Sequence, residues 1–231
     1  MKAKTAPRRT VPVAPAEVEV RPPWSRQTWV ALGVMGVLVA AVLGSGLLID
    51  HALAPSIPPA LAGCRTSTQT GPHTYFGPQP ICITAGQKFE ATVTTTQGVF
   101  VMQLHPEVAP VTVNNFIVLA IHGYYTGLTF WKSEDWVVQG GDPRGDGRGG
   151  PGYNLPDEAS NTPWGPGAVG MARVPGGSVN GSQFFVQKGA WPDPGPTATY
   201  NRFATVTSGQ GVVQLLTTSD SIISVTIRMV S

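Results

Sequence analysis

The sequence predicts a mainly β domain, closed as an antiparallel barrel and preceded by one transmembrane helix. Charged residues make up 12% of the chain, about half of the usual share, and the 28 Gly and 22 Pro indicate many turns. The C-terminal part contains many short apolar runs between these turn residues, which is typical of a closed antiparallel barrel. Residues 28–49, in contrast, form one long run without a charged side chain.

A basic, proline-rich tail opens the chain over residues 1–27. It shows no apolar periodicity, so we expect it to be disordered. Up to residue 28 there are six Lys and Arg and two Glu, a net charge of +4. From residue 88 onward, eight basic and ten acidic residues leave no excess positive charge to neutralise phosphates, which argues against a nucleic-acid partner.

Residues 28–49 are long enough to cross a membrane as a helix. At about 1.5 Å per residue, 22 residues span roughly 30 Å. The alternatives are a buried core helix, which usually has a polar stripe, and a cleavable signal peptide, whose apolar region is usually shorter. The basic tail places the N-terminus in the cytoplasm and the rest of the chain outside it. We therefore expect a single-pass membrane protein with an extracytoplasmic C-terminal domain.

Residues 50–87 contain six prolines and are interpreted as an extracytoplasmic spacer. The two cysteines of the chain, Cys64 and Cys82, both fall in this spacer. On the oxidising side of a membrane a disulfide between them is favoured, and two free thiols are the alternative.

The C-terminal part begins with a hairpin and a helix. Residues 89–104 are rich in β-branched and aromatic side chains and are interrupted by Gln97 and Gly98, which indicates a hairpin. Residues 110–121 carry apolar side chains at helical spacing behind an initial proline. A second, brief helix is predicted over 211–216. Further strands are predicted at residues 128–131, 136–139, 168–172, 184–187, 203–206 and 224–230.

Four ordered motifs go beyond composition. They are GYYTGLTF at 123–130, QGGDP at 139–143, GRGGPGY at 147–153 and NGSQFF at 180–185. Together they resemble the cyclophilin family of peptidyl-prolyl cis/trans isomerases over about residues 88–231. The resemblance implies a closed eight-stranded antiparallel barrel capped by two helices.

Other interpretations of these residues are weaker. The Gly-rich stretch 140–152 lacks the Gly-Lys-Ser/Thr ending of a phosphate-binding loop. The four histidines are scattered without the spacing of metal ligands, so we expect no metal and no cofactor.

Isomerisation of an X-Pro bond twists an amide over a barrier of about 18–20 kcal/mol, and no bond has to break. A catalyst needs an apolar slot for the proline ring and polar groups that favour the twisted amide. The resemblance implies Lys132 and Gln139 as catalytic residues and assigns peptide binding to Gln183 and the backbone of Ala172 and Arg173. It implies a proline slot lined by Trp136, Val137, Phe185 and Tyr200.

The sequence also departs from the family pattern. Lys132 stands where the family has an arginine, and a flexible ammonium lacks the planar fork of a guanidinium. The acidic residues Glu134 and Asp135 follow it and are able to pair with it. Trp136 replaces a phenylalanine, Arg173 an asparagine and Tyr200 a histidine.

The sequence therefore predicts a prolyl isomerase that acts on proline-containing polypeptides and assists the folding of extracytoplasmic proteins. The alternative is a catalytically weak cyclophilin-fold binding module, or an accessory subunit of a membrane protein assembly.

Overall fold

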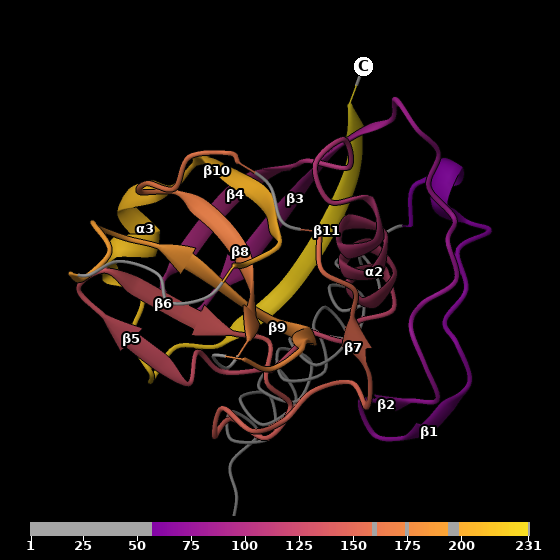
Figure 1. The fold of residues 1–231 in the computed structure, drawn as a ribbon, viewed down its shortest axis with the longest axis horizontal. Helices are drawn as coiled ribbons and strands as arrows, with labels where there is room; N and C mark the ends of the chain where they lie inside the picture. Colours follow the sequence, from indigo (N-terminus) through magenta and orange to yellow (C-terminus); the bar gives the residue numbers. More distant parts are fainter. Residues whose placement is uncertain (1–56, 159–160, 174–175, 194–198, 231) are drawn as a thin grey trace, which may run out of the picture. The chain divides into compact units, whose positions relative to one another are not determined.

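A curled β-sheet is the framework of the computed structural model, which describes residues 57–158, 161–173, 176–193 and 199–230 (Figure 1). Eight strands follow one another in the order β11-β3-β4-β10-β8-β9-β6-β5, and β7 pairs with β9 beside this path. The strands are β3 (Lys88–Thr95), β4 (Gly98–Leu104), β5 (Lys132–Glu134), β6 (Val137–Gly140), β7 (Asn154–Leu155), β8 (Ala168–Arg173), β9 (Val179–Gln187), β10 (Arg202–Ser208) and β11 (Ile222–Val230).

The predicted closure of the barrel is wrong, because the two outer strands, β5 and β11, do not pair along their length. Between these ends, the described residues show one isolated bridge, Thr129 with Ser221, and a few neighbouring hydrogen bonds. The carboxylate of Asp220 accepts hydrogen bonds from Thr217 and so closes a turn just before β11. This turn interrupts the extended backbone that a continuous ladder would require. Residues 128–131, predicted as a strand, form only the bridge at Thr129.

The predicted hairpin is confirmed as β3 and β4. Side chains of β3 alternate between buried and partly exposed positions, as expected for a sheet with one face on the core. The register pairs Thr95 with Gly98 at the turn. Gly98 has a φ of 141°, a backbone conformation that favours glycine.

Helix α2 (Pro110–Ile121) has the predicted bounds. Its residues 112–120 are all buried, polar ones included. Phe116 packs against Tyr125, Phe184 and Phe203 inside the curl of the sheet. The second helix, α3 (Gln210–Leu215), begins and ends one residue earlier than the predicted one.

Residues 57–87, interpreted as a spacer, pack on α2. Here lie the 3₁₀ helix η1 (Pro59–Leu61) and the hairpin β1–β2, made of β1 (Gln69–Gly71) and β2 (Thr74–Tyr75). Leu61, Tyr75 and Ile83 belong to the hydrophobic core. The segment thus covers a helix face that would otherwise be exposed.

The predicted tail 1–27 and span 28–49 lie outside the described residues. None of the helices in the described ranges combines the length and hydropathy needed to cross a bilayer.

Candidate functional site

Strand register brings three of the predicted catalytic and binding residues into one row. Lys132 of β5 lies opposite Gln139 of β6, and Gln139 lies opposite Phe185 of β9. Phe185 in turn lies opposite Gly170 of β8. Directly opposed residues point to the same face of a sheet, so the row presents these residues on the side away from the core.

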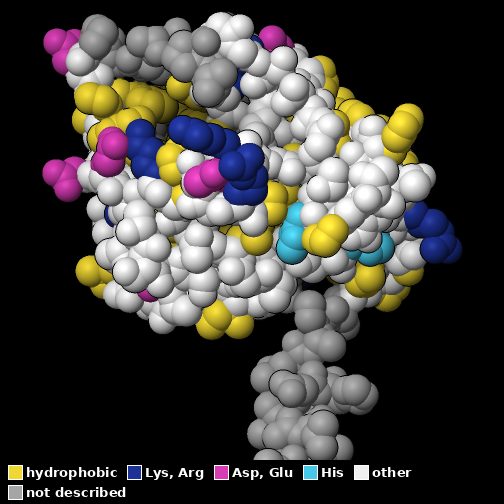
Figure 2. Space-filling model, turned by 90° about the horizontal axis from the view of Figure 1, so that it is seen from below, with side chains coloured by type: hydrophobic (Ala, Val, Ile, Leu, Met, Phe, Trp, Pro, Cys, Tyr) yellow, Lys and Arg dark blue, Asp and Glu magenta, His cyan; other side chains and the backbone are white. Residues whose placement is uncertain are grey.

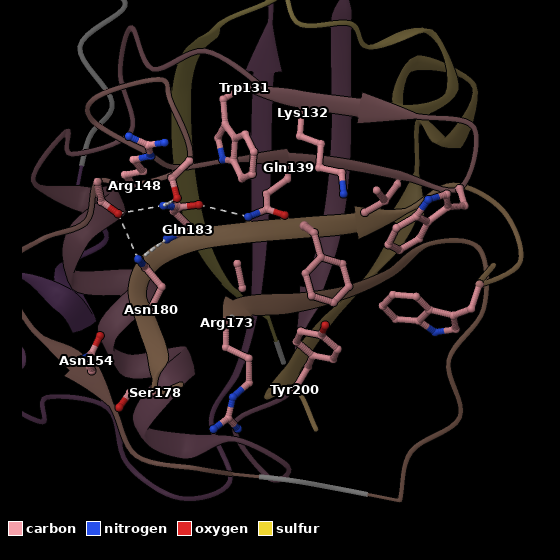
Figure 3. A pocket seen from close by; sticks show the side chains of 17 residues that line it. Trp131, Lys132, Gln139, Arg148, Asn154, Arg173, Ser178, Asn180, Gln183 and Tyr200 are labelled. Atoms are coloured by element: carbon pink, nitrogen blue, oxygen red, sulfur yellow. Dashed lines mark hydrogen bonds between the residues drawn. The ribbon is translucent and has the colours of Figure 1, made fainter. Parts of the chain in front are cut away.

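Lys132, Gln139 and Phe185 of this row line a groove with a cavity volume of about 570 Å³, which we call the aromatic groove, and form its floor. All nine residues predicted for catalysis or peptide binding line it. They are Lys132, Trp136, Val137, Gln139, Ala172, Arg173, Gln183, Phe185 and Tyr200. Figure 3 shows Lys132 and Gln139 on one side of the groove and Tyr200 on the opposite side.

Aromatic rings enclose Phe185. Trp164 stacks on it at 5.4 Å between ring centroids, and Tyr200 and Trp191 lie edge-on at 5.2 and 5.8 Å. Only 3% of Phe185 is exposed as a result. Phe185 therefore exposes only a small part of its ring to the groove. Trp191 and Tyr200 form the apolar rim of the groove.

Lys132 contacts a carboxylate and an aromatic ring. Its Nζ lies 3.2 Å from Oε1 of Glu134 and 5.2 Å from the ring centroid of Trp136. The indole Nε1 of Trp136 donates to the other oxygen of Glu134 at 2.6 Å. The predicted pairing with an acidic neighbour is confirmed for Glu134, and it restrains the ammonium at the edge of the groove.

The two glutamines connect the row to the Gly-rich loop. Gln139 donates from Nε2 to Oε1 of Gln183 at 3.0 Å. Nε2 of Gln183 donates to the carbonyls of Gly147 and Gly149. Because Gln183 is only 3% exposed, its amide holds a fixed orientation and so orients the amide of Gln139.

Arg173 closes the groove on the β8 side. Its guanidinium donates to Asp157 and to the carbonyls of Gly177 and Thr199. Burial raises the pKa of Tyr200 above its ordinary value of 10.0, and the charge of Arg173 opposes part of that rise. Tyr200 is thus a neutral phenol at pH 7 and serves as an apolar wall with a hydroxyl group.

Sequence reasoning missed several residues of the site. Trp131, Arg148, Asn154, Ser178 and Asn180 also line the aromatic groove. Trp164 packs behind Phe185 without lining the groove, and no local pattern indicates this contact. Asn180 lies within the NGSQFF motif, so the motif itself was a signal for it.

Among the described residues, the charged side chains that line the aromatic groove are all basic, namely Lys132, Arg148 and Arg173. Figure 2 shows basic side chains gathered beside hydrophobic ones on one face of the molecule. A groove with apolar walls and a positive edge is suited to an extended peptide rather than to a metal ion.

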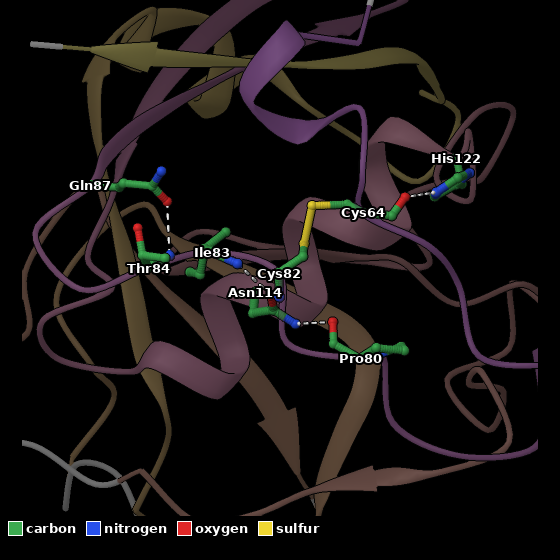
Figure 4. Close-up of a disulfide and its surroundings, with 8 residues drawn as sticks. All are labelled: Cys64, Pro80, Cys82, Ile83, Thr84, Gln87, Asn114 and His122. Carbon is green, nitrogen blue, oxygen red and sulfur yellow. Dashed lines mark hydrogen bonds between the residues drawn. A yellow bond between two sulfur atoms is a disulfide. The ribbon is translucent and has the colours of Figure 1, made fainter.

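The predicted disulfide between Cys64 and Cys82 is present, with 5.3 Å between the Cα atoms (Figure 4). Asn114 of α2 accepts hydrogen bonds from the backbone N–H groups of Cys82 and Ile83 and donates to the carbonyl of Pro80. His122 contacts the carbonyl of Cys64 at 3.0 Å. None of these residues lines the aromatic groove, so this disulfide is structural with respect to the site.

Comparisons with known proteins agree with this geometry. The model of the family described as "Cyclophilin type peptidyl-prolyl cis-trans isomerase/CLD" matches residues 90–230. A peptidyl-prolyl cis-trans isomerase of Synechococcus elongatus is 36% identical over 141 residues, which cover 60% of this chain and 95% of the relative. Peptidyl-prolyl cis-trans isomerase B of Bacillus subtilis is 44% identical over 110 residues, 46% of this chain and 75% of the relative.

Solved structures show the same fold. A cyclophilin-type peptidyl-prolyl cis-trans isomerase of Cryptosporidium parvum, solved in the presence of the dipeptide Ala-Pro, superposes with a TM-score of 0.54. It is 25% identical in sequence, and the match covers 60% of this chain and 98% of that one. The curled sheet, the motifs and the match over residues 90–230 together show that this chain belongs to the cyclophilin-type peptidyl-prolyl cis-trans isomerase family.

Proposed function

We propose that this isomerase acts on proline-containing polypeptides on the extracytoplasmic side of a membrane and assists their folding. The observation that carries the site assignment is the row of Lys132, Gln139 and Phe185 across three strands, which forms the floor of the aromatic groove. Extracytoplasmic action rests on the sequence, through the apolar run 28–49 and the basic tail before it.

In this proposal the proline ring packs against the apolar rim of Trp191 and Tyr200 and against Trp136, which also lines the aromatic groove. When the amide twists, its nitrogen regains a lone pair and resonance with the carbonyl is lost. Groups that favour the twisted amide over the planar one lower the barrier. In the row, the ammonium of Lys132 and the oriented amide of Gln139 are groups of this kind.

A direct, protease-free isomerisation assay of the full-length chain with a proline tetrapeptide tests the catalytic assignment. We expect Lys132→Ala to lower kcat/KM at least tenfold, about 1.4 kcal/mol of transition-state stabilisation. Lys132→Arg retains the charge and restores the planar fork, so we expect it to keep the rate or raise it. Lys88→Ala, an exposed change of equal charge on β3, is the matched control. A rate unaffected by Lys132→Ala would falsify the role of this ammonium.

A second candidate is a binding module, or an accessory subunit of a membrane assembly, with little turnover. Two contacts favour it: the ion pair that restrains Lys132 and the rings that leave 3% of Phe185 exposed. Peptide binding without measurable isomerisation in the same assay would support this candidate. In that case Glu134→Ala, which releases the ammonium, distinguishes a restrained enzyme from an inert groove by whether turnover rises.

The proposed topology has its own test. In intact spheroplasts, added protease should digest the C-terminal domain and leave the basic tail protected. A protected C-terminal domain would overturn the extracytoplasmic location and leave the isomerase assignment standing.

A further inference from the structure

A second groove, with a cavity volume of about 590 Å³, opens beside the aromatic groove. We call it the hairpin groove. The two grooves share four wall residues, Arg148, Gly149, Asn154 and Asn180. A peptide held in one groove can therefore continue into the other without leaving the surface.

One wall of the hairpin groove comes from residues outside the family match. Pro72, His73 and Thr74 belong to the hairpin β1–β2, whereas the family model begins at residue 90. The other wall is the Gly-rich loop of the domain, including Arg144 and Arg148. The groove is thus a property of this chain with its additional N-terminal hairpin.

Specific contacts hold the hairpin against the Gly-rich loop. The backbone N–H of Tyr75 donates to the carbonyl of Pro151 at 2.8 Å. Outside this loop, the ring of His73 also meets Tyr124 edge-on at 5.1 Å between centroids. At Gly152 a Cβ atom would lie 2.9 Å from the carbonyl oxygen of Tyr75, so a larger residue there would push the hairpin away. The hairpin wall is therefore in fixed contact with the loop that carries Arg148.

The charge of the two grooves is unbalanced at Arg148. No carboxylate is among the described residues that line either groove, whereas four basic side chains are. Three of these, Lys132, Arg144 and Arg173, form ion pairs with Glu134, Asp146 and Asp157. Within the described ranges the guanidinium of Arg148 has no direct ion pair, although its backbone N–H donates to Asp146 and its charge contributes to lowering the pKa of that carboxylate.

Figure 3 shows where this guanidinium lies. Arg148, Asn154 and Ser178 lie at the end of the aromatic groove away from Tyr200. Of these, Arg148 and Asn154 also line the hairpin groove. Guanidinium groups bind carboxylates with two parallel hydrogen bonds and so select for them over neutral side chains.

We propose that the hairpin groove extends the peptide-binding site. A client polypeptide whose proline lies in the aromatic groove places an acidic side chain in the hairpin groove, and this carboxylate binds to Arg148. This inference rests on the proposed binding of proline-containing chains in the aromatic groove. The inference adds a preference for clients that carry Asp or Glu within a few residues of the proline, either before it or after it but not on both sides. The hairpin β1–β2 supplies the wall that keeps this part of the client against Arg148.

Equilibrium binding to labelled peptides tests the proposal independently of turnover. Fluorescence anisotropy of the full-length chain is measured with a series of proline peptides that carry Glu, Gln or Lys at each of three positions before and after the proline. We expect one side to favour Glu over Gln by about fivefold to tenfold and to disfavour Lys. Arg148→Ala should reduce the Glu-to-Gln ratio to about one, and Arg148→Lys should retain part of it.

Matched variants separate the local effect from net charge. Arg228→Ala removes one positive charge from β11, where Arg228 pairs with Glu90, and should leave the ratio unchanged. Thr74→Glu places a carboxylate on the hairpin wall and should reverse the preference toward Lys. Gln69→Glu adds a carboxylate on β1, outside both grooves, and should leave the preference for Glu unchanged.

Each outcome decides the proposal. The proposal would be overturned by equal affinities for Glu and Gln peptides at every position before and after the proline. A preference for Glu that survives Arg148→Ala would also overturn it. Neutral peptides that are isomerised without any acidic preference would refute this inference alone. Acidic peptides that bind through Arg148 without being isomerised would refute the proposed catalysis alone, and a chain that binds no proline peptide would refute both.

Discussion

Gly170 determines how the aromatic residues of the groove pack. It lies opposite Phe185 in the sheet and leaves the space in which Trp164 stacks on Phe185. A Cβ atom at this position would lie 2.6 Å from Cη2 of Trp164 and 2.8 Å from Cζ of Phe185. The ring of Phe185 is thus supported from behind because one residue of β8 has no side chain.

We therefore expect Gly170→Ala to destabilise the protein by about 1–3 kcal/mol, since overpacking forces the two rings apart. Urea unfolding monitored by tryptophan fluorescence measures the change. Gly165→Ala is the control, because a Cβ atom there meets nothing within 4 Å. Equal stabilities of the two variants would show that the ring stack is not tight.

Asp220 makes stability depend on pH. Its carboxylate accepts hydrogen bonds from the N–H and Oγ1 of Thr217 and from Oγ1 of Thr96. The backbone N–H of Thr217, followed by the hydroxyl of Thr96, lowers its pKa below the ordinary value of 3.8. A lowered pKa in the folded state means that the stabilisation is complete above about pH 4 and is lost as the pH falls through the folded-state pKa.

We expect Asp220→Asn to lower the free energy of unfolding at pH 7 by about 1 kcal/mol. Because protonation removes the same charge from the wild-type carboxylate, the difference between the two proteins should shrink as the pH falls from 5 to 2. Urea titrations across this range measure the difference in the free energy of unfolding. A difference that does not change with pH would contradict the stabilising role of the ionised Asp220.

At the scale of elements, the start of helix α2 depends on a residue far along the chain. Ala109 provides no side-chain cap. Instead the carboxylate of Glu158 accepts hydrogen bonds from the N–H groups of Val111 and Thr112, each at 2.8 Å, and from Oγ1 of Thr112. A carboxylate at a helix N-terminus also interacts favourably with the helix dipole.

Glu158→Ala should destabilise the protein by about 1–2 kcal/mol, as the loss of an N-terminal cap does. Glu158→Gln should lose less, because one amide oxygen can still accept. Thermal unfolding followed by circular dichroism measures both variants. Glu107→Gln is the control, since this carboxylate is exposed and contacts only His105 among the described side chains. An equal shift in the control would remove the role of Glu158 as the cap.

At the scale of the whole molecule, the segment 57–87 is joined to the domain by its disulfide and by α2. The bond links residues 18 apart in the sequence. Asn114 holds the backbone beside Cys82, and Leu61, Tyr75 and Ile83 join the core. The hairpin that borders the second groove belongs to this segment, so the disulfide helps to keep the groove wall in place.

Removal of the disulfide by Cys64→Ala together with Cys82→Ala should lower the free energy of unfolding by about 3 kcal/mol, as expected for a loop of this length. Urea unfolding measures it, and dithiothreitol should destabilise the wild type by a similar amount. Addition of dithiothreitol to the double variant is the control and should change nothing. Unaltered stability after reduction would mean that the core contacts alone hold the segment.

The sequence by itself predicted the features that depend on neighbouring residues. The hairpin β3–β4 follows from alternating side chains and a Gln-Gly turn, and α2 from apolar spacing behind Pro110. The family resemblance also predicted nine residues that line the aromatic groove, of which Gln139, Gln183 and Phe185 lie within the quoted motifs.

Only the tertiary structure decided that the sheet stays open, that residues 57–87 cover α2, and that Trp164 packs behind Phe185. It alone placed the hairpin β1–β2 beside Arg148. Each of these features joins residues far apart in the chain, through strand register or side-chain contact. Periodicity and turn residues act over a few positions, so they determine local elements but not which of the distant elements meet.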